Sequence, residues 1–392
     1  MDKISKLPLG IIETILCLLP IQEAARTSIL SRFWRYRWIT IPKLAFIQDT
    51  FQVTDDAELS FLEQTFGATS ERRALTKRGR IFNAVYQVLL MHEGPIHEFA
   101  FSIDADDTCV EIDHMLHHLS RKNTVKKLKL EFCWWYINFR YKIPLSLFSF
   151  GQLTDLSIAG CILDHQPTFK GFGNLTSLHL EGIETTEKTL MHLLSHCPSL
   201  KSLNLDSDGT TIDHSGDFSI ADLFKCLPSI ENLCFCFHII HCFCPDRIPE
   251  KLPNALLHLK NLAINELCFH SIHGLPFLLL LIKSSPNLKT LKLQLEDNSD
   301  DDESEVSSDD ENEVEDYSNI WLEHLNELEI LDFSNGENAL GFVKLILAKS
   351  PVLKKVKILL DEDGDKDEEL QIMRILLRSP RVSPVVDIIV TF

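Results

Sequence analysis

The sequence has no hydrophobic run long enough to cross a membrane. Its longest apolar run, residues 275–282, contains eight residues, whereas a transmembrane helix needs about 20. The first apolar segment carries Glu13 and ends at Pro20, so it lacks the pattern of a signal peptide. We therefore expect a protein of the cytoplasm, the nucleus or both, with no membrane partner, whose eleven cysteines are free thiols.

The sequence also lacks the short motifs of common enzymes. It contains no GxSxG sequence, no Walker phosphate-binding loop and no HExxH sequence. We therefore predict no catalytic residues and no cofactor. Positive charge is scarce as well, because 38 Lys and Arg stand against 57 Asp and Glu and the formal net charge is −19. Phosphate binding depends on Lys and Arg, so this balance argues against a nucleic-acid partner.

Much of the negative charge lies in one segment. Residues 296–316 read EDNSDDDESEVSSDDENEVED and contain thirteen acidic residues and no Lys or Arg. Like charges repel and little apolar surface is available, so we predict a disordered insert over residues 296–318. Its role stays open between an inert surface loop, a site for basic partners and a site of phosphorylation.

One stretch, CFCFHIIHCFC, contains residues that could bind a metal. Thiolates and imidazoles bind zinc, but the two cysteines of a zinc pair are usually separated by about two to four residues, and a second pair is missing here. We therefore predict a cysteine-rich strand and loop and no metal site. The candidate ligands are Cys234, Cys236, His238, His241, Cys242 and Cys244.

A short phrase, apolar-x-x-apolar-x-apolar, recurs through most of the chain. Copies such as LTDLSI, LTSLHL and LKTLKL follow one another at steps of 22–30 residues, apart from one step of 40 that contains the acidic insert. Pro or Gly stands two residues before several copies, where it would end a preceding helix. This pattern is typical of leucine-rich repeats, which stack into a solenoid with a continuous core. The copies begin at Ile96, Val125, Leu153, Leu175, Leu200, Ile230, Leu259, Leu288, Leu328 and Leu353.

The first forty residues do not fit this repeat. Ile and Leu recur at helical spacing between Pro8 and Pro20, and IQEAARTSIL forms a second amphipathic stretch. In a third stretch, Leu30, Trp34 and Trp38 lie four residues apart, and we expect them to share one helix face. The interleaved arginines would also suit single-stranded nucleic acid, but this stripe favours packing on protein. So small a module cannot bury all of its apolar surface, and we expect part of it to contact a partner.

These N-terminal segments resemble a plant F-box. The resemblance is carried by Leu7-Pro8, Leu19-Pro20, the run Ala25–Ser31, and Trp34-Arg35 followed by Trp38. The family usually has a basic residue where this chain has Phe33. The stretches ENALGFVKLILAKSPVLKKVKILL and LLRSPRVSPVVDIIVTF are similar to the FBD domain, and several middle segments resemble F-box/FBD/LRR-repeat proteins. The resemblance covers essentially the whole chain apart from the acidic insert.

This resemblance implies an α/β fold. A three-helix F-box is followed by a leucine-rich-repeat solenoid, built on a curved parallel sheet, and by a C-terminal FBD cap. The predicted domains are the F-box (residues 1–45), a linking segment (46–95), the leucine-rich repeats (96–295), the acidic disordered insert (296–318) and the FBD domain (319–392).

The resemblance further implies a non-catalytic substrate-recognition subunit of a Skp1–cullin–F-box ubiquitin ligase. F-boxes bind a Skp1-like adaptor, which links them to a cullin and a RING subunit. A Skp1-binding scaffold or regulator without ubiquitination is the alternative, and a metal- or nucleic-acid-binding protein that kept the module is a third reading. The residues predicted to bind Skp1 are Leu7, Pro8, Ile11, Ile15, Leu16, Leu19, Pro20, Leu30, Trp34 and Trp38.

An unidentified target protein is expected on the strands of the repeats. Side chains alternate along a strand, so residues between the apolar positions point away from the core. They are mostly small and polar, which favours a protein or peptide target over nucleic acid. The residues predicted to line one concave target-binding surface are Asp155, Ser157, Ser177, His179, Ser202, Asn204, Cys234, Thr290 and Lys292.

Overall fold

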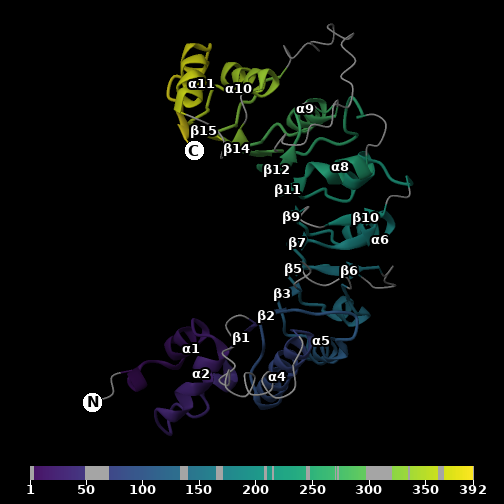
Figure 1. Ribbon diagram of the computed structural model, residues 1–392, viewed down its shortest axis with the longest axis vertical. Coiled ribbons are helices and arrows are strands. Elements are labelled where there is room, and N and C mark those ends of the chain that lie inside the picture. The colour runs from purple at the N-terminus through teal and green to yellow at the C-terminus, as the bar shows by residue number, and fades with distance from the viewer. Residues whose placement is uncertain are drawn as a thin grey trace. The chain divides into compact units, whose positions relative to one another are not determined.

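The structure of the chain, a computed structural model, divides into two compact units. Unit 1 comprises residues 1–199 and 208–213, and unit 2 comprises residues 200–207 and 214–392. Within each unit, parallel strands lie on one side and most helices on the other (Figure 1). The residues described are 4–48, 70–132, 140–164, 171–206, 210–213, 216–243, 248–269, 271, 273–296, 320–333, 336–360 and 366–391.

Unit 1 begins with a small helical module. Helices α1 (Leu9–Cys17) and α2 (Ile21–Arg26) start directly after Pro8 and Pro20, positions at which the missing proline N–H costs nothing. The prediction of a third helix is wrong, because the stretch after α2 forms short 3₁₀ turns at Thr27–Ile29 and Arg37–Thr40. A further 3₁₀ turn spans Ile4–Lys6.

A parallel sheet forms the centre of unit 1, and each strand pairs with the next along the chain. Its strands are β1 (Lys43–Ile47), β2 (Glu98–Ile103), β3 (Lys127–Phe132), β5 (Asp155–Ala159) and β7 (Ser177–Glu181). A second parallel sheet contains β4 (Tyr141–Lys142), β6 (Cys161–Leu163), β8 (Glu184–Thr186) and β10 (Thr211–Asp213). Helices α4 (Ser70–Met91), α5 (Val110–Lys122) and α6 (Glu187–Ser195) and a 3₁₀ turn (Leu145–Ser149) also belong to this unit.

Unit 2 repeats the same plan, with neighbouring strands again parallel. Its strands, in order across the sheet, are β9 (Ser202–Leu205), β11 (Asn232–Cys236), β12 (Asn261–Leu267), β13 (Thr290–Leu295), β14 (Glu327–Phe333), β15 (Lys355–Leu360) and β16 (Asp387–Thr391). Its helices are α7 (Ile220–Lys225), α8 (Phe237–Phe243), α9 (Gly274–Ser284), α10 (Glu337–Lys349) and α11 (Lys366–Arg378).

The repeated apolar phrase builds the core of both units. In β5 and β7, buried and half-buried residues alternate, so Leu156 and Leu178 point inward side by side. In β13, Leu291 and Leu293 are fully buried in the same way. Burying one such side chain contributes about 1.5–3 kcal/mol, and stacking many of them gives each unit its stability.

Strand β1 joins the N-terminal module to the sheet. It pairs with β2 over all five of its residues, Lys43–Ile47, and the Phe46 ring lies 5.8 Å from the Phe99 ring. Beside it, His92 Nε2 lies 2.9 Å from the carbonyl oxygen of Ile41. Burial lowers the pKa of His92, so its ring stays neutral and can donate to that carbonyl. The sequence analysis did not predict this strand.

The predicted fold class is confirmed, because helices at the N-terminus are followed by parallel strands of the leucine-rich-repeat type. The domain boundaries, including that of the FBD domain, stay predictions. The predicted disordered insert falls, from Asp297 onward, outside the described residues.

Candidate functional site

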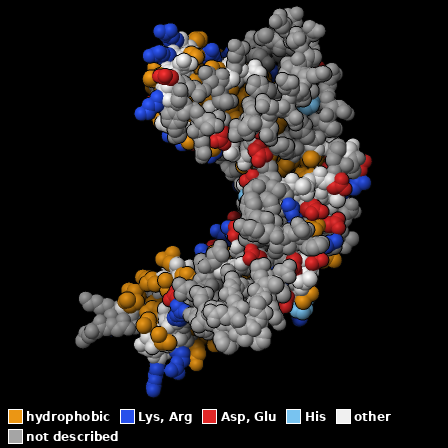
Figure 2. Space-filling view, in the orientation of Figure 1, with side chains coloured by type: hydrophobic (Ala, Val, Ile, Leu, Met, Phe, Trp, Pro, Cys, Tyr) orange, Lys and Arg blue, Asp and Glu red, His pale blue; other side chains and the backbone are white. Residues whose placement is uncertain are grey.

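The N-terminal module leaves much of its apolar surface exposed. In α1, Ile12 and Leu16 point inward and are fully buried, whereas Leu18, just beyond the helix, is 80% exposed, and Ile29 after α2 is 87% exposed. Figure 2 shows hydrophobic side chains gathered over α1 and α2. The apolar N-terminal surface comprises Ile4, Leu9, Ile11, Ile15, Leu18, Leu19, Ile29, Leu30, Phe33 and Tyr36. A contiguous exposed patch of this kind is typical of a protein–protein contact.

The structure divides the ten residues predicted to bind Skp1 into two groups. Leu16 is 0% exposed and Trp34 and Trp38 are each 6% exposed, so these three pack inside the module, and their assignment to a contact surface is corrected. Leu16 lies on the inward side of α1. For the two tryptophans the reason is the backbone, because i→i+3 turns replace the expected helix and leave Leu30 exposed while Trp34 and Trp38 are buried. The remaining residues are half-buried or exposed and stay predicted contacts: Leu7, Pro8, Ile11, Ile15, Leu19, Pro20 and Leu30.

The arginines and rings of this module contact one another. The Arg37 guanidinium lies 4.3 Å from the centroid of the Phe33 ring, and Arg37 Nε donates to the Phe33 carbonyl at 3.2 Å. The Phe33 ring meets Trp34 edge to face, with centroids 6.1 Å apart. The contacts among Arg37, Phe33 and Trp34 therefore stabilise the module from within.

In unit 1, four of the predicted target-binding residues border one hollow of about 360 Å³ on the strand face. Asp155 and Ser157 come from β5, and Ser177 and His179 come from β7. All four are half-buried, as expected for side chains on the outward face. The alternation rule thus brings these four residues together.

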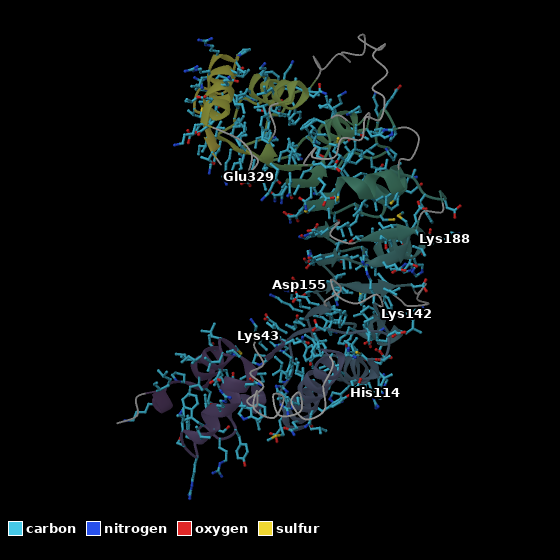
Figure 3. All side chains as sticks on the ribbon, viewed as in Figure 1. Lys43, His114, Lys142, Asp155, Lys188 and Glu329 are labelled. Atoms are coloured by element: carbon cyan, nitrogen blue, oxygen red, sulfur yellow. The ribbon has the colours of Figure 1, made fainter. Side chains whose placement is uncertain are left out.

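Charged side chains from three further strands complete this hollow. Glu98 on β2 lies between Lys43 and Lys127, at 3.8 Å and 3.6 Å. Figure 3 shows Lys43 and Asp155 on the strand side of unit 1, opposite Lys142 and Lys188. The lining of the hollow therefore carries both signs of charge.

In unit 2, the other five predicted residues lie on the outward strand face. Ser202 and Asn204 on β9 stand beside Asn232 and Cys234 on β11, because these strands are in register. Asn204 Oδ1 is buried and has no hydrogen-bond partner among the described residues. Burial raises the pKa of Cys234 to about 11, so this thiol is neutral at physiological pH.

Strand β12 separates this pair of strands from Thr290 and Lys292 on β13. It presents Asn261 and Ala263 between them, and the Asn261 side chain donates to Asn232 at 2.6 Å. All five predicted residues of unit 2 are half-buried. Whether they bind a target stays a prediction.

Sequence reasoning missed a set of lysines at the strand starts of unit 2. Lys201, Lys260, Lys289 and Lys354 each precede a strand and are exposed. A signal was present, because Lys is the second letter of the copies LKSLNL, LKNLAI, LKTLKL and LKKVKI. The repeat was defined by its apolar positions alone, so these lysines were not predicted as a site.

The cysteine-rich stretch shows no metal site within the described residues. Among these, no group of three or more His, Cys, Asp and Glu side chains is arranged to hold a metal ion. Cys236 is fully buried and its Sγ donates to Glu266 Oε2 at 2.7 Å. The side chains of His238, His241 and Cys244 lie outside the described residues. Over the same part of the chain, no helix is long and apolar enough to cross a membrane.

Comparison with known proteins matches both parts of this architecture. A family model of the F-box domain matches residues 4–43, and a model of the LRR repeats of FBD-associated F-box protein At5g56370 matches residues 112–216. The chain is 29% identical to F-box/FBD/LRR-repeat protein At1g13570 of Arabidopsis thaliana, over 98% of this chain and 97% of that protein. The predicted resemblance to F-box/FBD/LRR-repeat proteins is confirmed. The module that carries the apolar N-terminal surface is thus the F-box.

Two other Arabidopsis thaliana proteins match part of the chain. FBD-associated F-box protein At5g56370 is 28% identical over 60% of this chain and 49% of its own length. Putative F-box/FBD/LRR-repeat protein At4g13965 is 28% identical over 52% of this chain and 42% of its own length. This F-box/LRR chain therefore spans nearly all of one relative and less than half of the other two.

Proposed function

We propose that this F-box protein recruits a target protein to a Skp1–cullin–F-box ubiquitin ligase. The F-box would hold a Skp1-like adaptor, which brings the cullin and RING subunits, and the strand faces of the repeats would hold the target. The observation that supports this most is the apolar N-terminal surface, which stays exposed although Ile12, Leu16 and Trp34 already form a core beneath it. Covering such a surface with a partner gains about 25 cal/mol per Å².

The proposed role needs binding rather than chemistry from this chain. In such a ligase the conjugating enzyme carries ubiquitin as a thioester, and the adaptor holds the target close to it. Burial raises the pKa of Cys109 to about 11 and that of Cys197 to about 12, so these thiols are protonated and poor nucleophiles. A location in the cytoplasm or nucleus stays part of the prediction.

The double variant Ile11→Glu/Leu30→Glu tests the proposal. Both side chains are exposed, at 48% and 67%, so the variant is expected to fold. Skp1 binding should weaken at least tenfold, because a carboxylate buried in an apolar interface without a partner costs well over the roughly 1.4 kcal/mol that corresponds to tenfold. Co-purification and calorimetry with a purified Skp1-like protein would measure this.

Val385→Glu in unit 2 is the matched control. It is also an exposed apolar residue, 69% accessible, but it lies far along the chain from the F-box. We expect its Skp1 affinity to equal that of the unchanged chain. Undiminished Skp1 binding by a folded Ile11→Glu/Leu30→Glu variant would contradict the proposal.

A further inference from the structure

A row of basic side chains runs along the strand starts of unit 2. The lysine row is defined by backbone hydrogen bonds, because the amide of each member after the first donates to the carbonyl of the previous one at 2.7–2.9 Å. Neighbouring members therefore lie about one strand spacing, ~4.8 Å, apart. The members, in order, are Lys201, Glu231, Lys260, Lys289, Asn326 and Lys354.

The carboxylate in this row does not neutralise it. Glu231 accepts from Lys260 at 2.6 Å and from Lys201 at 3.2 Å, and the hydrogen bonds from Lys260 and Lys201 lower the pKa of Glu231, which keeps it ionised. Within the described part of the chain, Lys289 and Lys354 take part in no ion pair. Since each ammonium group has three donors, the row keeps unused donors for a partner.

The neighbouring row, one residue further along the chain at each strand, leaves the surplus in place. It adds Lys355 and two carboxylates, Glu327 and Asp387, so the two rows together carry five lysines and three carboxylates. The remaining members are uncharged: Ser202, Asn232, Asn261 and Thr290. A basic edge on a chain of net charge −19 is the reverse of the overall charge, and it complements an acidic partner.

The arrangement favours an acidic protein segment over a nucleic acid. Single-stranded nucleic acids bind to aromatic platforms, whereas the described aromatic side chains of these strands, such as Phe235 and Phe333, are buried beneath the face. The carboxylates of Glu231, Glu327 and Asp387 are interspersed among the lysines and would repel a continuous phosphate backbone. Separate carboxylates on a peptide can pair with lysines while avoiding these positions.

We propose that the lysine row of unit 2 binds an Asp/Glu-rich segment of the target protein. This inference rests on the proposed function, in which the strand faces of the repeats hold the target. It adds a substrate class, since targets would be selected by clustered carboxylates that pair with Lys260, Lys289 and Lys354.

The test uses the full chain and a fluorescein-labelled deca-glutamate peptide as the probe. Fluorescence anisotropy should show binding that weakens as NaCl rises from 50 to 200 mM, because surface ion pairs are screened by salt. In the variant Lys260→Gln/Lys289→Gln/Lys354→Gln the affinity should fall at least tenfold, through the loss of three weak ion pairs. Circular dichroism and Skp1 binding should not change.

The matched control is Lys283→Gln/Lys344→Gln/Lys366→Gln. These three lysines are also exposed and also in unit 2, but they belong to helices α9, α10 and α11. Peptide affinity should stay within twofold of that of the unchanged chain. An equal loss in both variants would overturn the proposal, because net charge alone would then explain the binding.

Three other outcomes would also overturn it. One is absence of peptide binding by the unchanged chain at 50 mM NaCl. A second is binding that appears only after residues 297–316 are deleted, since the chain's own acids would then be the partner of the row. A third is tighter binding of deca-uridine RNA than of deca-glutamate at the same lysines. Retained Skp1 binding in any of these cases would show that the lysine row has been misassigned while the proposed ligase role stands.

Discussion

Phe277→Ala is expected to destabilise unit 2 by about 3–5 kcal/mol. Phe277 lies on α9, is 0% exposed and meets the Phe235 ring edge to face, with centroids 5.9 Å apart. Removing the ring leaves a cavity between the helix of one repeat and the strand of another. Since each repeat is stabilised mainly by its neighbours, the loss should lower the unfolding midpoint of the whole unit in guanidinium chloride.

Leu377→Ala on α11 provides the comparison. This side chain is also on a helix of unit 2 but is 54% exposed, so we expect a change of no more than about 0.5 kcal/mol. Circular dichroism during chemical unfolding would measure both variants. Equal stability of Phe277→Ala and the unchanged chain would contradict the described packing of α9 on the strands.

Arg78→Met is expected to destabilise unit 1 by about 2–3 kcal/mol, somewhat less than the loss of one partner of a fully buried pair. Arg78 on α4 donates two hydrogen bonds to the carboxylate of Asp106, at 3.2 Å and 3.0 Å, and 12% and 23% of the two side chains are accessible. Without the guanidinium, the partly buried carboxylate loses its counter-charge. Thermal unfolding at pH 7 would measure the loss.

The same pair predicts how stability depends on pH. Burial alone would raise the pKa of Asp106, but hydrogen bonds from Arg78 and Thr108 outweigh it and lower this pKa from 3.8 to about 2. A carboxyl whose pKa is lower in the folded state contributes stability above its unfolded pKa and loses it as pH falls from about 4 toward 2. Asp106→Asn and Arg78→Met should both lose most of this dependence. Unchanged acid sensitivity in Arg78→Met would contradict the role of the pair.

The repeats could be predicted from sequence because the apolar positions that define the repeated phrase are the same residues that pack in the core. Leu156 and Leu178 recur at matching positions, and the same residues lie side by side in adjacent strands. Alternation along the strands then placed Ser157 and His179 on the outward face, where both border the hollow. Local periodicity carries this information without any knowledge of distant contacts.

The parts that were missed fall outside the regular spacing of the repeats. The stretch IPKLAF, from Ile41 to Phe46, matches the repeated phrase, and Leu44 and Phe46 of β1 pair with Phe99 and Phe101 of β2. It was not predicted as a strand because it lies much further than 22–30 residues before the next copy, at Ile96. In the F-box, the spacing of Leu30 and Trp34 fits a helix, yet the Ser28 hydroxyl donates to the Arg35 carbonyl at 2.8 Å and holds a tight loop instead. That hydrogen bond competes with helix formation, as serine side chains often do.

Because strand β1 pairs with β2, it fixes the distance along the sheet of unit 1 between the F-box and each later strand. The F-box match ends at its first residue, Lys43, and the next strands follow in fixed order through β2, β3 and β5 to β7. A protein held at β7 would sit four strand spacings, about 19 Å measured along the sheet, from the F-box. In the proposed ligase, the strand on which a target docks would then set the distance between that target and the F-box. Inserting one repeat between β1 and β7 would increase this distance by a single strand spacing.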